Sequence, residues 1–143
     1  MNSIKLLLVD DEKAFLETIA KRLEKRGLGV ESAGGGQEAL EMLETHQTID
    51  AVILDVKMPG MDGIETLTEI KKQFPLVEVI MLTGHATVET AINGMKLGAF
   101  DYLMKPCDID LLISKASAAA DRKKQHEEKI VEARIKEITG RRA

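Results

Sequence analysis

The sequence predicts an α/β domain with a mostly parallel sheet covered by helices on both faces. Two observations indicate this class. Short apolar runs of strand length alternate with segments in which apolar residues recur at helical spacing. Five strands and five helices fit this alternation with short turns between them, as in sheets built from strand–helix–strand units. A length of 143 residues suits one domain with a substantial hydrophobic core.

The first elements show the alternation most simply. An apolar strand is predicted at 4–9, and the helix after it has apolar residues four positions apart and ends at Gly27, a favourable C-terminal stop. A weaker strand follows at 28–33, because Gly29 and Glu31 interrupt its apolar run. Apolar residues then mark the second helix: Ala39, Leu40 and Leu43.

The second half of the chain repeats the pattern. A strand is predicted at 51–54, and the third helix opens at Asp62 with a sequence close to a capping box and stops before Pro75. A strand at 77–82 leads to a fourth helix around 88–95. The last elements are a strand at 102–104 and an unusually long fifth helix that begins near Asp108.

Composition and charge exclude several classes of protein. Hydrophobic residues make up 44% of the chain and charged residues 31%, which is ordinary for a globular protein in water. The net charge of −4 gives no reason to expect general binding to nucleic acid or membranes. The apolar runs are too short to span a bilayer, and the single cysteine, Cys107, leaves no disulfide within the chain. We therefore expect a cytoplasmic protein without membrane contact.

Polar residues stand where the predicted strands end. Asp10 and Asp11 follow the first strand, Asp55 follows the third, Thr83 the fourth and Lys105 the fifth. Parallel strands bring their carboxyl ends to one edge of a sheet, where open α/β sheets bind ligands, so we expect these side chains to converge. Three carboxylates and one ammonium leave a net charge of −2, which one divalent cation balances. An all-oxygen site with open positions suits Mg²⁺.

Each of these residues also has an ordinary structural explanation. Asp10 or Asp11 could cap the next helix, and Asp55 could be a turn residue. Thr83 could cap a strand end, and Lys105, which precedes a proline, could be an exposed extended residue. One cap does not explain two adjacent aspartates, however, and the coincidence at four strand ends favours a shared site.

Four stretches at these strand ends carry a recognisable combination of residues. They are Val9-Asp10-Asp11-Glu12, Ile53-Leu54-Asp55 with Met58-Pro59-Gly60-Met61-Asp62-Gly63, Thr83-Gly84-His85-Ala86, and Gly98-Ala99-Phe100-Asp101-Tyr102-Leu103-Met104-Lys105-Pro106. Together they resemble the receiver domains of two-component response regulators over about residues 3–120. The last two stretches look most like receivers of sigma-54-dependent transcription activators. The resemblance implies a flavodoxin-like doubly wound sheet with strand order 2-1-3-4-5, and a cis peptide bond before Pro106.

The resemblance also implies a role for most of the strand-end residues. Asp55 would be the phosphoacceptor, which takes a phosphoryl group from a phosphohistidine on a sensor histidine kinase or phosphotransfer protein. Asp11, Asp55 and the backbone carbonyl of Lys57 would bind Mg²⁺, and Asp10 would do so directly or through water. Lys105 and the metal would neutralise charge on the transferring phosphoryl group.

The resemblance further implies a conformational switch. Thr83 would bond a phosphate oxygen after transfer, and Tyr102 would rotate inward behind it. This coupling would move the face formed by the fourth helix, the fifth strand and the fifth helix. His85 and Lys57 occupy positions that in receivers tune the access of water to the acyl phosphate. The protein would promote its own phosphotransfer and dephosphorylation without turning over a separate substrate, so it is not expected to be an enzyme.

The end of the chain departs from a minimal receiver. We expect a receiver domain over 1–121 and a charged helical extension over 122–143. The extension carries opposite charges four residues apart, which support a helix only weakly. It also carries an apolar patch that the domain cannot cover: Ile130, Val131, Ile135 and Ile138. The patch belongs either to a plain linker or to a docking surface for a partner or a second copy of the chain, and we favour the docking surface.

Two other classes share parts of this pattern. A flavodoxin-type cofactor binder needs a loop rich in Ser, Thr and Gly after its first strand, where this chain has Asp10, Asp11 and Glu12. A phosphatase of the haloacid dehalogenase type needs a second aspartate two residues after the nucleophile, where this chain has Lys57. Both therefore fit less well than a receiver.

The output of the switch is not evident from the sequence. No helix-turn-helix or ATPase motif follows the receiver, so direct DNA binding is not expected. The chain is either a single-domain regulator that acts through protein contacts or the receiver fragment of a longer sigma-54-dependent activator. The start at Met1 and the helix stop at Gly140 favour the single-domain regulator.

Overall fold

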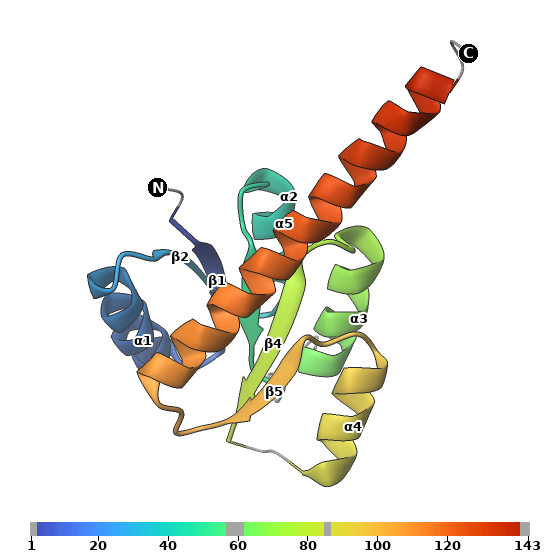
Figure 1. Ribbon diagram of the computed structural model, residues 1–143. Helices are drawn as coiled ribbons and strands as arrows, with labels where there is room; N and C mark the ends of the chain where they lie inside the picture. Colours follow the sequence, from blue (N-terminus) through green and yellow to red (C-terminus); the bar gives the residue numbers. More distant parts are fainter. Residues whose placement is uncertain (1–2, 57–61, 85–86, 141–143) are drawn as a thin grey trace.

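Five parallel strands in the order β2-β1-β3-β4-β5 form the sheet of the computed structural model (Figure 1). The structure describes residues 3–56, 62–84 and 87–140. The strands are β1 (Lys5–Val9), β2 (Gly29–Ala33), β3 (Ala51–Leu54), β4 (Glu78–Thr83) and β5 (Asp101–Met104). All neighbouring strands pair in parallel, so the predicted fold class and strand order are confirmed.

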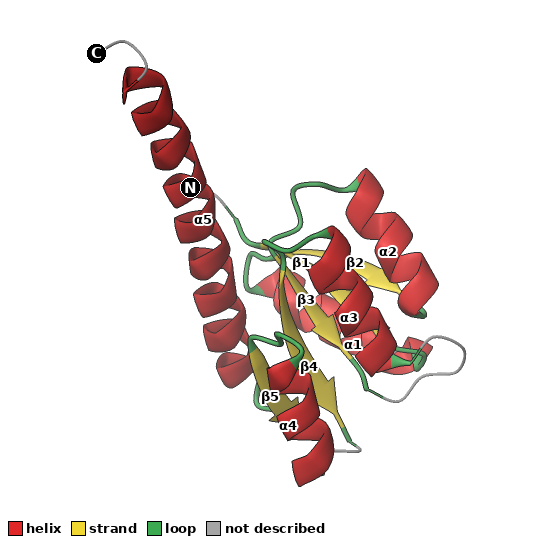
Figure 2. Cartoon of the chain, turned by 90° about the vertical axis from the view of Figure 1, so that its right-hand side faces the viewer, coloured by secondary structure: helices red, strands yellow, loops and turns green. Residues whose placement is uncertain are grey.

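Helices cover both faces of this sheet (Figure 2). They are α1 (Lys13–Lys25), α2 (Gly36–Thr45), α3 (Gly63–Gln73), α4 (Val88–Lys96) and α5 (Ile109–Gly140). Side chains of α1 and α5 pack against one face with strand residues such as Leu8 and Ile53, and those of α2 and α3 pack against the other with Leu7 and Val52. Successive strand residues point to opposite faces, and here both faces are buried. This explains why the central strands are apolar throughout rather than alternating.

Local signals account for several element ends. Gly27 follows α1 with a φ of +87°, a backbone conformation that favours glycine. Asp62 caps α3, since its Oδ1 accepts a hydrogen bond from the backbone N–H of Glu65 at 2.8 Å. The peptide bond between Lys105 and Pro106 is cis, as the resemblance implied. Four strands begin one residue away from their predicted starts, an ordinary shift at element ends.

The helix α5 is 32 residues long, and its C-terminal part extends away from the sheet (Figure 1). Two ion pairs hold its middle: Arg122 Nε lies 3.3 Å from Glu78 Oε2, and Lys123 Nζ lies 3.7 Å from Asp50 Oδ1. Every residue from 127 to 140 is exposed. The division into a receiver and an extension after residue 121 stays a prediction, because α5 is continuous there. In the part of the chain that the structure describes, no helix is long and apolar enough to cross a bilayer.

Candidate functional site

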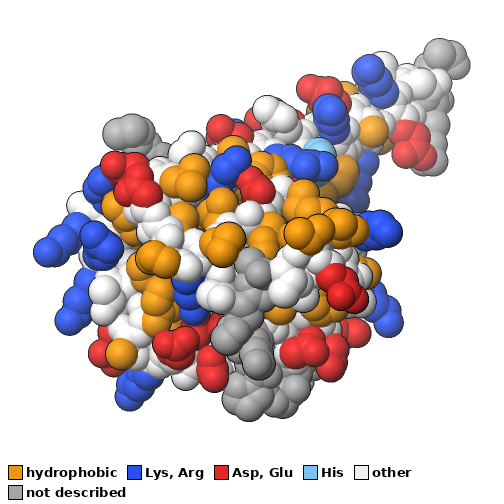
Figure 3. Space-filling model, turned by 90° about the horizontal axis from the view of Figure 1, so that it is seen from below, with side chains coloured by type: hydrophobic (Ala, Val, Ile, Leu, Met, Phe, Trp, Pro, Cys, Tyr) orange, Lys and Arg blue, Asp and Glu red, His pale blue; other side chains and the backbone are white. Residues whose placement is uncertain are grey.

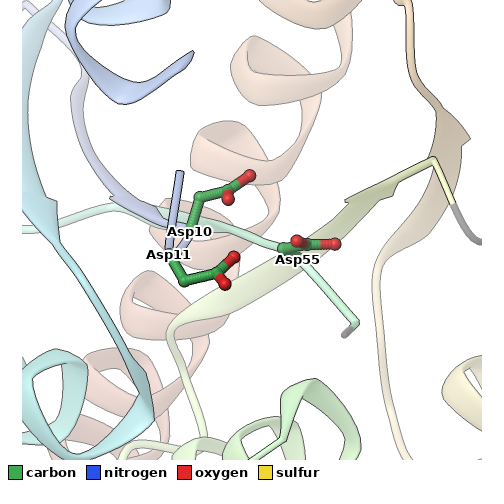
Figure 4. A group of neighbouring side chains, drawn as sticks. All are labelled: Asp10, Asp11 and Asp55. Atoms are coloured by element: carbon green, nitrogen blue, oxygen red, sulfur yellow. The ribbon is translucent and has the colours of Figure 1, made fainter. Parts of the chain in front are cut away.

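Three aspartates meet at the carboxyl edge of the sheet (Figure 4). Asp10 and Asp11 directly follow β1, and Asp55 directly follows β3, the neighbour of β1 in the sheet. Asp10 and Asp55 are 2% and 4% exposed, whereas Asp11 is exposed to solvent. One carboxylate oxygen of each aspartate lies within 4.8 Å of the other two. The structure therefore brings together three carboxylates that were expected to converge because they follow the ends of parallel strands.

Lys105 brings positive charge to this cluster from the end of β5. Its Nζ lies 2.5 Å from Asp10 Oδ2 and 3.8 Å from Asp55 Oδ2. Glu12, to which the sequence assigned no role, places a carboxylate oxygen 3.8 Å from the same ammonium. The ammonium also lies 4.0 Å from the centroid of the Phe15 ring, a cation–π contact. Among the described residues, this one ammonium thus pairs with several carboxylates, and the cluster keeps an excess of negative charge.

The two buried aspartates use their oxygens differently. Asp10 Oδ1 accepts a hydrogen bond from the backbone N–H of Glu12 at 2.9 Å, while Oδ2 pairs with Lys105. Asp10 therefore accepts a hydrogen bond within its own turn and also belongs to the aspartate cluster. Asp55 Oδ1 is buried and has no hydrogen-bond partner among the residues that the structure describes. A buried oxygen without a partner is destabilising unless another group binds it.

This set of oxygens fits a hard divalent cation. The ligand atoms are all carboxylate oxygens, and Asp55 Oδ1 is available to bind. Few protein ligands and open positions suit Mg²⁺, which retains water and bridges to phosphate oxygens. Lys57, whose backbone carbonyl is the remaining predicted ligand, lies outside the described residues, and so does His85.

A close backbone contact fixes the position of Asp55. A Cβ atom added at Gly63 would lie 2.2 Å from the carbonyl oxygen of Asp55 and 2.5 Å from Cα of Val56. The backbone N–H of Gly63 donates to the Val56 carbonyl at 2.8 Å. The start of α3 thus lies directly against the chain segment that carries Asp55, an approach that only glycine permits. The sequence showed Gly63 only as part of a motif, because this contact between two separate segments has no periodic signal.

Thr83 and Tyr102 stand on adjacent strands and share one face of the sheet. Thr83 ends β4 and is fully buried, and Tyr102 pairs in register with Met81, two residues before Thr83. Side chains two positions apart on a strand point to the same face, so Thr83 lies on the face that Tyr102 occupies. The phenol oxygen of Tyr102 lies 2.8 Å from Oγ1 of Thr90 in α4. No pattern in the sequence indicates a role for Thr90.

An ion pair next to Tyr102 ties β5 to α5. Asp101 lies 2.8 Å from Lys115 Nζ, and its Oδ1 accepts a hydrogen bond from the backbone N–H of Tyr102 at 2.7 Å. Burial raises the pKa of the Asp101 carboxyl, but the hydrogen bonds from Lys115 and from the Tyr102 backbone outweigh it, and the pKa is lowered overall. Asp101 is therefore ionised at neutral pH and forms an ion pair between β5 and α5.

A family model described as the response regulator receiver domain matches residues 6–117 of this chain. The fold and the aspartate cluster indicate the same class. The chain belongs to the receiver family of two-component response regulators. Receivers are signalling domains, which interact with histidine kinases or phosphotransfer proteins and do not turn over a separate substrate.

Curated relatives are longer response regulators. The putative NtrX-like response regulator of Rickettsia conorii is 37% identical over 132 residues, and the transcriptional regulatory protein ZraR of Escherichia coli is 41% identical over 111 residues. These alignments cover 91% and 78% of this chain but 28% and 25% of the relatives. The chain therefore spans about a quarter of the length of these relatives.

Solved receiver structures are similar over nearly their whole length. A response regulator receiver domain protein from Clostridium thermocellum is 41% identical with a TM-score of 0.81, covering 85% of this chain and 98% of that one. The receiver domain of NtrX from Brucella abortus is 35% identical with a TM-score of 0.75, covering 81% and 98%. The similarity therefore extends over the sheet and the helices that surround it.

Proposed function

We propose that Asp55 is the phosphoacceptor of this receiver and that Asp10, Asp11 and Asp55 bind Mg²⁺ beside it. The observation that carries the proposal is the buried Asp55 carboxylate. One of its oxygens has no hydrogen-bond partner among the described residues, while the other lies 3.8 Å from Lys105 Nζ. An oxygen in this position can act as a nucleophile, and the neighbouring ammonium can neutralise an incoming phosphoryl group.

Phosphotransfer at this site forms one bond and breaks one. An Asp55 oxygen attacks the phosphorus of a phosphohistidine on a sensor kinase or phosphotransfer protein. The phosphorus–nitrogen bond breaks, its electron pair leaves with the histidine, and an acyl phosphate remains on Asp55. Lys105 balances charge on the phosphoryl oxygens, and the Thr83 hydroxyl bonds one of them after transfer. Asp10, Asp11 and Asp55 would hold a Mg²⁺ ion, which would supply further positive charge for the transfer.

The proposal includes further roles carried over from the family. The backbone carbonyl of Lys57 would complete the metal site, and Lys57 and His85 would tune the access of water to the acyl phosphate and so its lifetime. The proposed function is also consistent with the cytoplasmic location expected from the sequence. The alternative, a receiver that forms one part of a longer sigma-54-dependent activator, is compatible with the greater length of the curated relatives.

Incubation with a small phosphodonor such as phosphoramidate tests the proposed function. We expect the intact mass of the protein to rise by one phosphoryl group when Mg²⁺ is present, and to stay unchanged when the metal is chelated or when Asp55 is replaced by asparagine. A phosphoryl group that survives alkaline treatment, or that forms equally well in chelator, would contradict an acyl phosphate formed at this site.

The output face of the proposed switch already exposes apolar side chains. Figure 3 shows hydrophobic side chains across the face of the domain that is seen from below. The most exposed large apolar residues on α4, β5 and the start of α5 are Val88, Ile92, Met95, Met104 and Leu111. A small shift of α4 relative to β5 would therefore change which apolar surface is available to a partner.

Replacing Thr83 with alanine should separate phosphorylation from switching. The variant keeps Asp55 and the aspartate cluster, so we expect it to accept a phosphoryl group from phosphoramidate. The variant lacks the hydroxyl that would bond a phosphate oxygen. The backbone NMR shifts of Tyr102 and of α4 should therefore change little when beryllofluoride, an analogue of the phosphoryl group, is added. Shift changes as large as those of the wild type would show that Thr83 is not the reporting residue.

We propose that the apolar patch of α5 pairs with a second copy of the chain. Four aliphatic side chains at helical spacing are 40–57% exposed on a helix that the Arg122–Glu78 and Lys123–Asp50 ion pairs connect to the domain. The patch consists of Ile130, Val131, Ile135 and Ile138. Two helices joined along this short seam would form a weak dimer, because stable coiled coils need about three to four heptads.

Truncation after Lys129 tests this pairing. The truncated chain keeps both ion pairs and the receiver, so we expect it to melt as the full chain does and to accept phosphate equally well. Its sedimentation coefficient should lose the concentration dependence that self-association gives to the full chain. A full chain that sediments as a monomer at all concentrations would mean that the extension is a linker or binds a different protein.

A further inference from the structure

Tyr102 is held against α4 along one side of that helix. Its phenol oxygen lies 2.8 Å from Thr90 Oγ1. One turn further along α4 is Gly94, which is buried, and a Cβ atom added there would lie 3.7 Å from the Tyr102 ring. Residues four apart on a helix share a face, so the ring lies along the line from Gly94 to Thr90 and its hydroxyl ends at Thr90. The helix α4 therefore defines the position of Tyr102 through Gly94 beside the ring and Thr90 at the hydroxyl.

The Thr90 hydroxyl can satisfy all of its hydrogen bonds in this arrangement. Thr90 Oγ1 accepts from the backbone N–H of Thr87 at 3.0 Å, and it lies 3.1 Å from the Thr87 carbonyl oxygen, to which it can donate. One lone pair remains, and either the Tyr102 hydroxyl at 2.8 Å or the Thr87 hydroxyl at 3.0 Å can donate to it. The same side chain thus belongs both to the capping box of α4 and to the contact with Tyr102.

We infer that Thr90 is a positioning residue for the switch: its hydroxyl holds Tyr102 against α4 and opposes the movement toward Thr83. The inference rests on the proposed function, in which Tyr102 moves when Asp55 is phosphorylated. Tyr102 occupies the face of the sheet on which Thr83 lies, yet its only polar side-chain group is committed to α4. Movement of the ring toward Thr83 requires the loss of this hydrogen bond, so the strength of the bond sets the balance between the two positions.

The composition of the chain makes this residue directly observable. Tyr102 is the only tyrosine, and the chain has no tryptophan. A fluorinated tyrosine incorporated during expression therefore gives one ¹⁹F resonance, which reports Tyr102 alone. Titration with beryllofluoride in the presence of Mg²⁺ gives the apparent affinity for the analogue and the resonance positions of the free and bound states.

Replacing Thr90 with valine removes the hydroxyl and keeps the shape of the side chain. Loss of one hydrogen bond that opposes switching should tighten beryllofluoride binding roughly fivefold, because the competent position of Tyr102 becomes more populated. The resonance of the free variant should also move toward that of the bound wild type. Thr90→Ser restores the hydroxyl and should return both quantities to wild-type values.

A second control separates this contact from capping of the helix. Thr87 Oγ1 accepts from the backbone N–H of Thr90 at 3.0 Å, which is the other half of the capping box. Thr87→Ala weakens the cap but leaves the Thr90 hydroxyl available to Tyr102, so its affinity for beryllofluoride should stay within twofold of wild type. An equal gain in Thr87→Ala and Thr90→Val would assign the effect to fraying of α4 and overturn the inference.

The remaining outcomes distinguish the inference from the proposed function. Unchanged or weaker binding by Thr90→Val, with a wild-type resonance that still moves on titration, would overturn the positioning role of Thr90 and leave the switch intact. A wild-type resonance that does not move at saturation would overturn the movement of Tyr102 itself, and the role of Thr90 with it.

Discussion

Asp55→Asn is expected to raise the melting temperature of the protein in the absence of metal. One carboxylate oxygen from each of Asp10, Asp11 and Asp55 lies within 4.8 Å of the other two. Among the described residues, the Lys105 ammonium balances only part of their charge. Lys105 lies closer to Asp10 than to Asp55, so removal of the Asp55 charge leaves its shorter ion pair intact. Relief of repulsion at such a site should stabilise the fold by about 1–2 kcal/mol.

The same variant should respond less to Mg²⁺. A ligand that binds only the folded state stabilises it, so millimolar Mg²⁺ should raise the melting temperature of the wild type, and more than that of Asp55→Asn. Asp121→Asn is a matched control, because Asp121 is an exposed aspartate on α5 outside the cluster. A wild type indifferent to Mg²⁺, together with an Asp55→Asn variant no more stable than Asp121→Asn, would rule out the cluster as described.

Gly63→Ala is expected to destabilise the protein and to impair phosphorylation at Asp55. In an exposed helix interior, alanine is more favourable than glycine by about 1 kcal/mol. Here the added methyl group would lie 2.2 Å from the Asp55 carbonyl oxygen and 2.5 Å from the Cα atom of Val56. Both are backbone atoms, which cannot move aside as a flexible side chain would. Overpacking of this kind should lower the free energy of unfolding by about 1–3 kcal/mol, measured by urea denaturation.

Gly35→Ala provides the matched control. Gly35 precedes α2 with a φ of −173°, an extended conformation that any residue adopts, and a Cβ atom there would meet nothing within 4 Å. Its substitution should change stability by less than about 1 kcal/mol, the range of a weakened helix cap, and should leave phosphorylation unaffected. Equal effects of the two substitutions would mean that the contact between Gly63 and the Asp55 segment does not position the phosphoacceptor.

The fold could be predicted from the sequence because its determinants are local and periodic. Apolar runs such as 51–54 and the helical spacing around Leu23 report burial directly. Gly27 marks a helix end through its backbone conformation, and Asp62 marks another through its side-chain oxygen. The convergence of Asp10 and Asp55 also followed from the sequence, since parallel strands place their carboxyl ends at one edge. Strand order required the family resemblance, because spacing alone does not specify which strands are neighbours.

Other features of the site could not be predicted because they depend on contacts between distant segments. Glu12 approaches Lys105, and Thr90 approaches Tyr102, only after β5 pairs with β4. The burial of Lys123 likewise depends on Asp50, which precedes β3 and lies far from α5 in the sequence. Lys123 lies in a stretch without apolar side chains, which suggests a solvated helix. Only the folded structure shows that Lys123 pairs with Asp50.

Chemical trapping of the phosphoryl group tests the central claim most directly. Borohydride reduces an acyl phosphate on aspartate to homoserine, and peptide mass spectrometry then locates the modified residue. After incubation with phosphoramidate and Mg²⁺, we predict homoserine at position 55 and unmodified aspartate at positions 10 and 11. Homoserine at position 10 or 11 instead, or a phosphorylated protein that yields no homoserine, would contradict the assignment of Asp55 as the phosphoacceptor.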